Sequence, residues 1–179
     1  MPSADSASIA PLLDIQDLSV SFGGVPVVRG LSLCLHKGRT MCLVGESGSG
    51  KSMTAFSIMR LVPDTGRIAA KAIHFDGEDL LSLSEKDMRR RRGRDISMIF
   101  QEPMTSLNPV FTVDRQLSEP FIIHQGMSKK EAHEQALKML YDVQIPNPEA
   151  VIKQYPHQLS GGMRQRVMIA MALACRPKI

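Results

Sequence analysis

The sequence contains no tryptophan and only two tyrosines among its 179 residues. It has three cysteines, an odd number without C-x-x-C spacing, which is typical of a reduced, cytosolic protein with buried thiols. Long apolar runs are also absent: the longest uncharged stretch near the C-terminus, Val167 to Cys175, has nine residues, whereas a membrane-spanning helix needs about 20. The first dozen residues lack the apolar core of a signal peptide. We therefore expect a soluble or peripheral cytoplasmic protein.

Neither sign of charge dominates. The 22 basic and 18 acidic residues leave a net charge of +4, which is too small to indicate a nucleic-acid partner, and we expect none. The run from Arg89 to Arg94 is interpreted as the solvated, cationic end of a helix. With 43% apolar and 22% charged residues, the composition excludes a wholly disordered, collagenous or coiled-coil chain. Residues 1–11 are small and polar and predict a flexible tail.

Hydrophobic patterns predict an α/β fold. Partly alternating residues at 12–22 and 25–35 indicate two antiparallel strands joined by a glycine turn. The continuous apolar run Thr40–Val44 predicts a central strand buried on both faces, and a helix is expected from Lys51 to about Val62. A further strand is expected at Ile96–Phe100.

Turn and capping signals place the remaining elements. Ile73–Phe75 followed by Asp76-Gly77 predicts a strand that ends in a turn. Capping-box patterns at Ser84 and Ser128 predict two helix starts. A last helix rich in alanine and methionine is expected from Met163 to Cys175.

A phosphate-binding loop is predicted between the apolar run and the first helix. Gly45-Glu46-Ser47-Gly48-Ser49-Gly50-Lys51-Ser52 fits the pattern G-x-x-x-x-G-K-[ST]. Phosphates need several N–H donors at once, and glycines let them approach the backbone closely. Lys51 can reach the β- and γ-phosphates, and the Ser52 hydroxyl can ligate Mg²⁺. Met53 follows on the same helix start and is included in the predicted ATP site. The alternative is a glycine-rich loop with an incidental lysine.

A second helix start has similar properties. Leu159-Ser160-Gly161-Gly162-Met163 opens the last predicted helix with one hydroxyl and two glycines. Helix N-termini attract anions through their free N–H groups. The simpler interpretation is a serine N-cap followed by a glycine turn.

Together the two motifs resemble those of ABC-type ATPases, whose signature motif is LSGGQ. Met163 stands here where glutamine is usual. The resemblance implies that Ser160, Gly161 and Gly162 act in trans, on the ATP held by the phosphate loop of a second ATP-binding subunit. It also implies a P-loop NTPase core sheet, an N-terminal antiparallel β-subdomain and an inserted helical subdomain at about 102–163, within a nucleotide-binding domain at 12–179.

A third segment narrows the resemblance to one branch of the ABC-type ATPases. The string from Met98 to Pro109, with Tyr155–Gln158 before the signature, resembles the ATP-binding subunits of dipeptide, oligopeptide, nickel and glutathione importers. By this resemblance Gln101 is a catalytic residue with Lys51, ligates Mg²⁺ and couples the site to transmembrane permease subunits. Phe22 takes a position where an aromatic ring stacks on adenine, although a packing role at a strand end fits it nearly as well.

The resemblance also implies parts that follow the signature helix. These are a Walker B aspartate, an adjacent glutamate and a switch histidine, whereas only Pro177, Lys178 and Ile179 follow Arg176 here. We interpret the chain as truncated before Walker B and expect it to bind Mg-ATP but hydrolyse it negligibly. Asp76 is not expected to substitute, because Asp-Gly predicts a turn.

The predicted function is that of an ATP-binding subunit of an ABC importer for peptides or related small solutes, peripheral on the cytoplasmic side of the inner membrane. An external solute-binding protein would be an indirect partner. Two alternatives stay open: a soluble ABC-type ATPase without membrane partners, and a non-functional truncated gene product.

Overall fold

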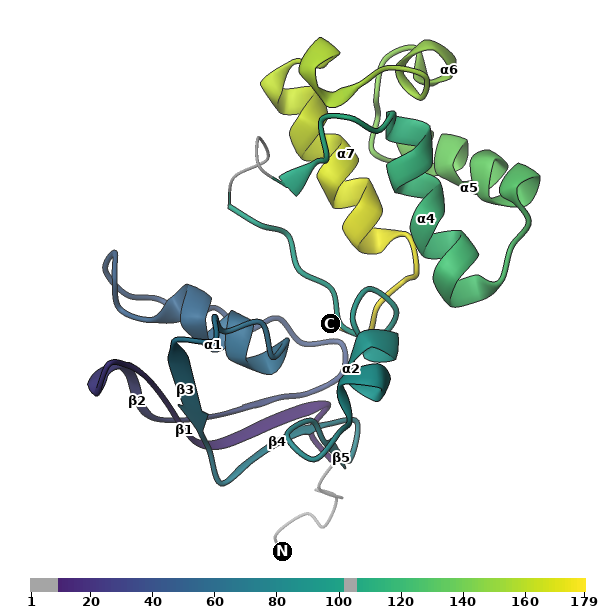
Figure 1. The fold of residues 1–179 in the computed structure, drawn as a ribbon. Helices are drawn as coiled ribbons and strands as arrows, with labels where there is room; N and C mark the ends of the chain where they lie inside the picture. The colour runs from purple at the N-terminus through teal and green to yellow at the C-terminus, as the bar shows by residue number, and fades with distance from the viewer. Residues whose placement is uncertain (1–9, 102–105) are drawn as a thin grey trace, which may run out of the picture. The chain divides into compact units, whose positions relative to one another are not determined.

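The computed structural model describes residues 10–101 and 106–179, which fall into two compact units (Figure 1). Residues up to Met88 form the first unit, and Arg89–Ile179 form the second. Of the predicted tail at 1–11, residues 1–9 lie outside the described part, and residues 10 and 11 lead directly into the first strand.

The first unit is built on one long hairpin. Strands β1 (Leu13–Phe22) and β2 (Val25–Leu35) pair antiparallel through Gly23 and Gly24, both at positive φ, as the sequence predicts. The other edge of β1 pairs antiparallel with β4 (Ala72–Phe75) over its first half and with β3 (Gly66–Ala69) over its second.

A short hairpin completes this sheet. Strand β5 (Glu78–Asp79) pairs with β4 across a turn in which Asp76 has φ 52° and Gly77 φ 83°. Asp76 therefore lies in the turn that the sequence predicts, where aspartate tolerates a left-handed backbone.

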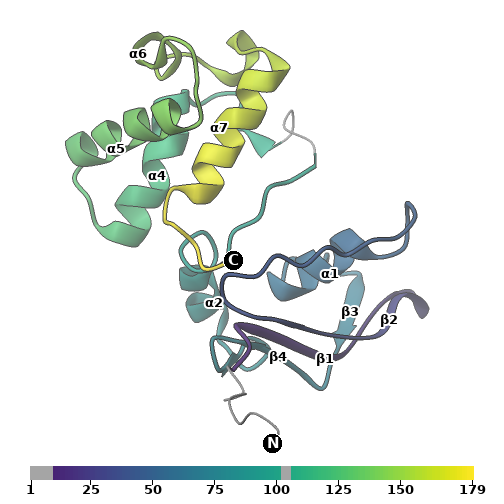
Figure 2. The ribbon, with the colours of Figure 1, turned by 180° about the vertical axis from the view of Figure 1, so that it is seen from behind.

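A bulge keeps the apolar face of β1 in phase. Leu13, Ile15, Leu18 and Val20 are all at most 3% exposed. The spacing changes from two to three residues between Ile15 and Leu18, where the register with β2 shifts and Asp17 takes φ 54°. An extra residue at a bulge returns later side chains to the same face. Helix α1 (Lys51–Ile58) lies against β1 and β2 (Figures 1 and 2).

Several detailed expectations are wrong. The segments Thr40–Val44 and 97–100 are not strands, and Val44 is 90% exposed. A strand needs a neighbour to satisfy its N–H and C=O groups, and within the described ranges neither segment pairs with a strand of the sheet. Helix α1 ends at Ile58 rather than near Val62. The thiols of Cys34 and Cys42 are exposed rather than buried.

Helix α2 (Glu85–Arg91) leads to the segment before Gln101. It begins with the predicted cap, because the Ser84 hydroxyl accepts from Asp87 N at 3.2 Å. Burial alone would raise the pKa of Asp95, but hydrogen bonds from Arg94 and Arg91 outweigh it and hold that pKa below its ordinary value.

The backbone around Asp95 makes an isolated parallel bridge between Arg92 and Ile96. Ile179 N donates to Asp95 O at 3.3 Å, and Ser97 N donates to Ile179 O at 2.8 Å. These two bonds join the backbone of Ile179 to the residues on either side of Ile96.

The second unit is mainly helical (Figure 2). It holds α4 (Val113–Gln125), α5 (Lys129–Asp142), α6 (Pro148–Val151), the 3₁₀ turn η1 (Pro156–Gln158) and α7 (Gly161–Leu173). Their apolar faces enclose a main core, which includes Leu107, Val113, Leu117, Leu140, Ile152, Leu159 and Val167, and a smaller cluster of Phe121, Ala132 and Ala174.

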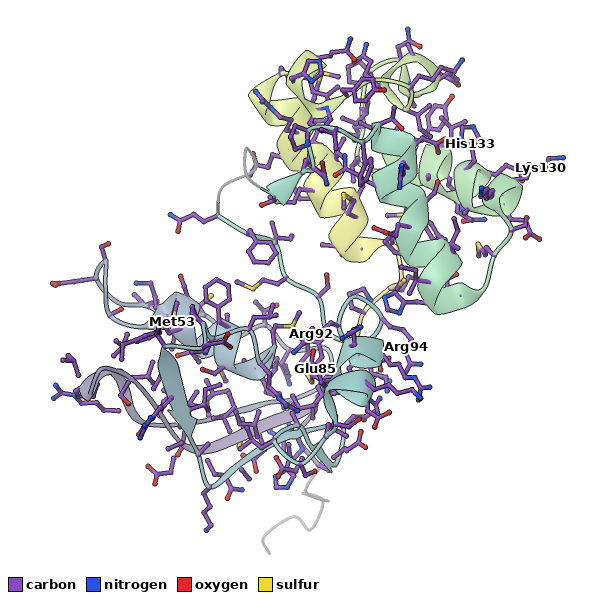
Figure 3. The ribbon with its side chains drawn as sticks, viewed as in Figure 1. Met53, Glu85, Arg92, Arg94, Lys130 and His133 are labelled. Atoms are coloured by element: carbon purple, nitrogen blue, oxygen red, sulfur yellow. The ribbon has the colours of Figure 1, made fainter. Side chains whose placement is uncertain are left out.

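Capping explains where two of these helices begin. The Ser128 hydroxyl accepts from Glu131 N, and Ser128 N donates to Glu131 Oε2 at 2.8 Å, so the predicted capping box is present. Lys130, in the same first turn, extends away from the helix (Figure 3). Helix α4 lacks a comparable sequence signal and contains Pro120; its start is fixed by Thr112, whose hydroxyl accepts from Arg115 N.

Candidate functional site

The predicted phosphate loop runs directly into helix α1. Gly50 is the N-cap residue at φ 89°, and its carbonyl accepts from Thr54 N at 2.9 Å and from the Thr54 hydroxyl at 3.1 Å. Inside the loop, Ser49 N donates to Glu46 O at 3.2 Å. The first N–H groups of a helix have no partner inside it, so those at the start of α1 are available to an anion.

Close packing explains two of the loop's glycines. A Cβ on Gly50 would lie 2.7 Å from Val27 O and 2.9 Å from Val28 Cγ2. A Cβ on Gly45 would lie 2.6 Å from Ser49 Oγ. By contrast, a Cβ on Gly48 would meet no atom within 4 Å, so that glycine is explained by its φ of +83°.

The Lys51 ammonium closes the loop on itself. Its Nζ donates to Gly45 O at 2.7 Å, to Glu46 O at 2.6 Å and to Ser49 Oγ at 3.2 Å. All three acceptors are exposed to solvent. The cation is therefore already positioned at the loop, and phosphate oxygens are stronger acceptors that it can take up by exchange.

A cavity of about 440 Å³ opens beside this lysine. Residues from β2, from the segment before the loop and from α1 line it, including Val27, Val28, Leu43, Ser49, Lys51 and Thr54. Its volume lies within the range of small-molecule sites, about 300–1,000 Å³.

The other predicted site residues of the first unit are Ser52, Met53 and Phe22, and each has a different local environment. Ser52 is exposed on the first turn of α1. Met53 lies beside it, half-buried (Figure 3), and its carbonyl accepts from Ser57 Oγ at 2.7 Å. The Phe22 ring packs on Gly66, where a Cβ would lie 2.7 Å from Phe22 Cε1. This contact explains the aromatic residue as packing, and its stacking on adenine stays a prediction.

Gln101 is exposed and is the last described residue before the gap at 102–105. Residues 102–105, which belong to the predicted coupling loop, lie outside the described residues. The role of Gln101 therefore stays a prediction.

The signature motif forms the start of α7. Leu159 is 4% exposed and belongs to the core, whereas Ser160, Gly161 and Gly162 are exposed. Ser160 is the N-cap, and its Oγ accepts from Met163 N at 3.3 Å. Because this oxygen accepts inside the cap, its proton is left to donate to an outside acceptor.

The two glycines of the signature keep this helix end open. A Cβ on either Gly161 or Gly162 would meet no atom within 4 Å. Met163 packs against the core of the second unit. The two motifs thus form exposed helix N-termini, one in each unit, and the two differ in chemistry: a lysine lies beside the first, and a hydroxyl donor lies at the second.

Two residues to which the sequence patterns assigned no individual role support the signature. Arg166 Nη1 donates to Val143 O at 3.1 Å and to Gln144 O at 2.7 Å, which joins α7 to the end of α5. Gln158 closes the 3₁₀ turn before Ser160. Both are polar side chains whose partners are backbone groups, and residue type and spacing alone do not indicate such contacts.

Comparison with protein families shows to which family the chain belongs. The family model described as ABC transporter matches residues 28–179. The chain belongs to the ABC transporter family. This match includes the phosphate loop, Gln101 and the signature, and it confirms the resemblance predicted from those motifs.

Individual relatives are ATP-binding proteins named for glutathione import and for oligopeptide and dipeptide transport. The chain is 49% identical over 189 residues to the glutathione import ATP-binding protein GsiA of Salmonella typhimurium, covering all of this chain and 30% of the relative. It is 49% identical to the oligopeptide transport ATP-binding protein OppD of the same species, covering 56% of it. It is 54% identical over 173 residues to the dipeptide transport ATP-binding protein DppD of Bacillus subtilis, covering 94% of this chain and 52% of the relative. The chain spans about a third to just over half of these relatives.

Solved structures confirm the predicted α/β class as an ABC cassette fold, with an antiparallel sheet and helices. A dimeric post-hydrolysis state of the ATP-binding cassette MJ0796, bound to ADP and Pi, matches with a TM-score of 0.81 at 26% identity, over 92% of this chain and 70% of that one. An ATP-binding subunit of an ABC transporter matches with a TM-score of 0.72 at 26% identity, over 93% and 63%. Among the described helices, none has the length and apolar character required to cross a bilayer.

Proposed function

We propose that this chain forms the ATP-binding part of an ABC importer subunit that serves uptake of peptides or related small solutes. The observation that carries the proposal is that one chain holds both a lysine-closed phosphate loop and an open signature helix start. The names of its relatives, one for glutathione import and two for oligopeptide and dipeptide transport, support the substrate class.

The residues of the loop fit a nucleotide. Lys51 exchanges its bonds to Gly45 O and Glu46 O for bonds to phosphate oxygens, while the backbone N–H groups at the start of α1 bind the same phosphates. Mg²⁺ prefers oxygen ligands, which the Ser52 hydroxyl and the Gln101 amide would provide. Mg²⁺ would neutralise charge between the β- and γ-phosphates. Phe22 would stack on the adenine.

The signature would act on the nucleotide of a second subunit. The Ser160 hydroxyl, which accepts from Met163 N, keeps a proton to donate to an outside acceptor, and Gly161 and Gly162 leave the backbone of this helix end accessible. A dimer in which each signature closes on the other copy's ATP uses both features. The dimeric form of the MJ0796 cassette supports this arrangement.

The membrane partners follow from the same proposal. Gln101 and the loop after it would transmit closure of the dimer to transmembrane permease subunits, and the subunit would work on the cytoplasmic side of the inner membrane. An external solute-binding protein would contribute indirectly. Nucleic acid has no part in this function.

The experiment that tests the proposal is a titration of the purified chain with Mg-ATP, combined with a phosphate-release assay. We expect saturable binding that weakens when Mg²⁺ is chelated. We expect release well below about 1 per second, the low end of ordinary enzymes, because Asp76, which follows strand β4, lies in the turn of an antiparallel hairpin. Absence of Mg-ATP binding would contradict the proposed function, and turnover above that rate would contradict the second expectation alone.

A further inference from the structure

The turn that precedes the signature is closed by one glutamine. Gln158 Oε1 accepts from Tyr155 N at 2.8 Å, and Gln158 N donates to Tyr155 O at 2.9 Å. Leu159 N then donates to Pro156 O at 3.1 Å. The side chain of Gln158 thus binds the backbone N–H of Tyr155, and its backbone N–H binds the Tyr155 carbonyl. Together these bonds fix the path of the chain from Tyr155 to Gln158.

This turn lies between two buried anchors. Pro156 and Leu159 are buried, and Leu159 belongs to the core of the second unit. The residues between them, His157 and Gln158, are exposed, and the Tyr155 ring stacks on the His157 ring with centroids 5.7 Å apart. Ser160 follows Leu159 directly, so the geometry of the turn sets the direction in which the N-cap leaves the core.

The energetics of an exposed hydrogen bond favour a positioning role over a stabilising one. The Gln158 side chain is exposed, and such a bond adds little net stability because water replaces it on unfolding. A reacting or binding group, however, must be held within a fraction of an ångström to be effective. Loss of the bond therefore leaves the fold intact and relaxes the position of the Ser160 hydroxyl.

We propose that Gln158 is a positioning residue for the signature, which holds Ser160 where it can reach the nucleotide of a second copy. This inference rests on the proposed function. It assigns Gln158 a role in association of the two copies and none in binding ATP to its own phosphate loop, which lies in the other unit of the chain.

The test compares three variants of the full chain. Gln158→Leu removes the acceptor at similar size, Gln158→Glu keeps an oxygen acceptor, and Gln135→Leu makes the leucine exchange on α5, outside this turn. For each, sedimentation velocity measures self-association with and without Mg-ATP. Mg-ATP affinity under dilute conditions and the melting temperature are measured in parallel.

We expect Gln158→Leu to weaken ATP-dependent association about tenfold, which corresponds to about 1.4 kcal/mol, with the melting temperature and Mg-ATP affinity unchanged. Gln158→Glu is expected to restore association to near the original value, and Gln135→Leu to behave as the original chain. Unchanged association in Gln158→Leu would overturn the inference, as would a parallel fall in melting temperature and ATP affinity. If the original chain binds Mg-ATP but does not associate, the dimer of the proposed function and the inference both fail.

Discussion

Replacing Lys51 by alanine is expected to weaken Mg-ATP binding by about 10- to 150-fold. A hydrogen bond to a charged group contributes about 1.5–3 kcal/mol, and each 1.4 kcal/mol is a factor of ten in affinity. Lys51 is positioned for this role because its Nζ already lies 2.6–2.7 Å from two carbonyl oxygens of the loop. Isothermal titration calorimetry with Mg-ATP measures the loss.

Two controls separate loss of the phosphate contact from general damage. Lys37→Ala removes an exposed lysine of the same unit from a turn outside the loop, and it is expected to leave affinity unchanged. Adenosine, which has no phosphate, should bind the original chain and Lys51→Ala equally weakly. Equal Mg-ATP affinity of Lys51→Ala and the original chain would place the nucleotide elsewhere.

Replacing Gly50 by alanine is expected to destabilise the first unit far more than the same change at Gly48. Both glycines have similar backbone conformations, with φ of +89° and +83°, so each substitution incurs about 1–2 kcal/mol of left-handed strain. Only at Gly50 does the new Cβ also meet backbone, at 2.7 Å from Val27 O. Overpacking of this kind adds about 1–3 kcal/mol.

Chemical denaturation of the two variants measures this difference directly. Gly48→Ala serves as the matched control, because it carries the same strain without the contact. We expect the free energy of unfolding to be lower for Gly50→Ala than for Gly48→Ala by about 1–3 kcal/mol. Equal values would show that the loop moves away from β2 without cost.

Local chemistry explains which parts of the fold were predictable. The β1–β2 hairpin, the capping box at Ser128 and the turn at Asp76 follow from short-range patterns, and all three occur in the structure. Helix α4 was not predicted for two reasons. Its N-cap Thr112 does not belong to a capping box, and Pro120 lies within the helix.

The predictions that were wrong or absent concern residues whose structure depends on contacts that the local sequence pattern does not indicate. Thr40–Val44 has the composition of a buried strand, but an apolar run becomes a strand only beside a neighbour, and within the described residues none pairs with it. Gln158 was recognised only as part of the string Tyr155–Gln158, and its individual role was not predicted for a related reason. Its importance depends on a hydrogen bond to Tyr155 N, and no residue type or spacing signals that bond.

In the candidate site, too, some features were predictable from local sequence and others were not. The phosphate loop and signature were recognisable because their chemistry requires glycines, a lysine and a hydroxyl at fixed spacing. The structure adds what those residues contact: Lys51 on the loop carbonyls, and Ser160 on Met163 N. The role of Phe22 depends on a ligand, and its contact with Gly66 explains it equally well without one.

The central claim is that the phosphate loop of one copy and the signature of another form a single nucleotide site. Mixing two variants tests it most directly. Lys51→Ala removes the first half of the site. Ser160→Asp removes the second half, because aspartate keeps the N-cap while its charge repels phosphate. Association in the presence of Mg-ATP is measured by sedimentation velocity, for each variant alone and for an equimolar mixture. The account predicts that neither variant associates alone and that the mixture forms dimers with one competent site each. A mixture that stays monomeric while the original chain associates would contradict it.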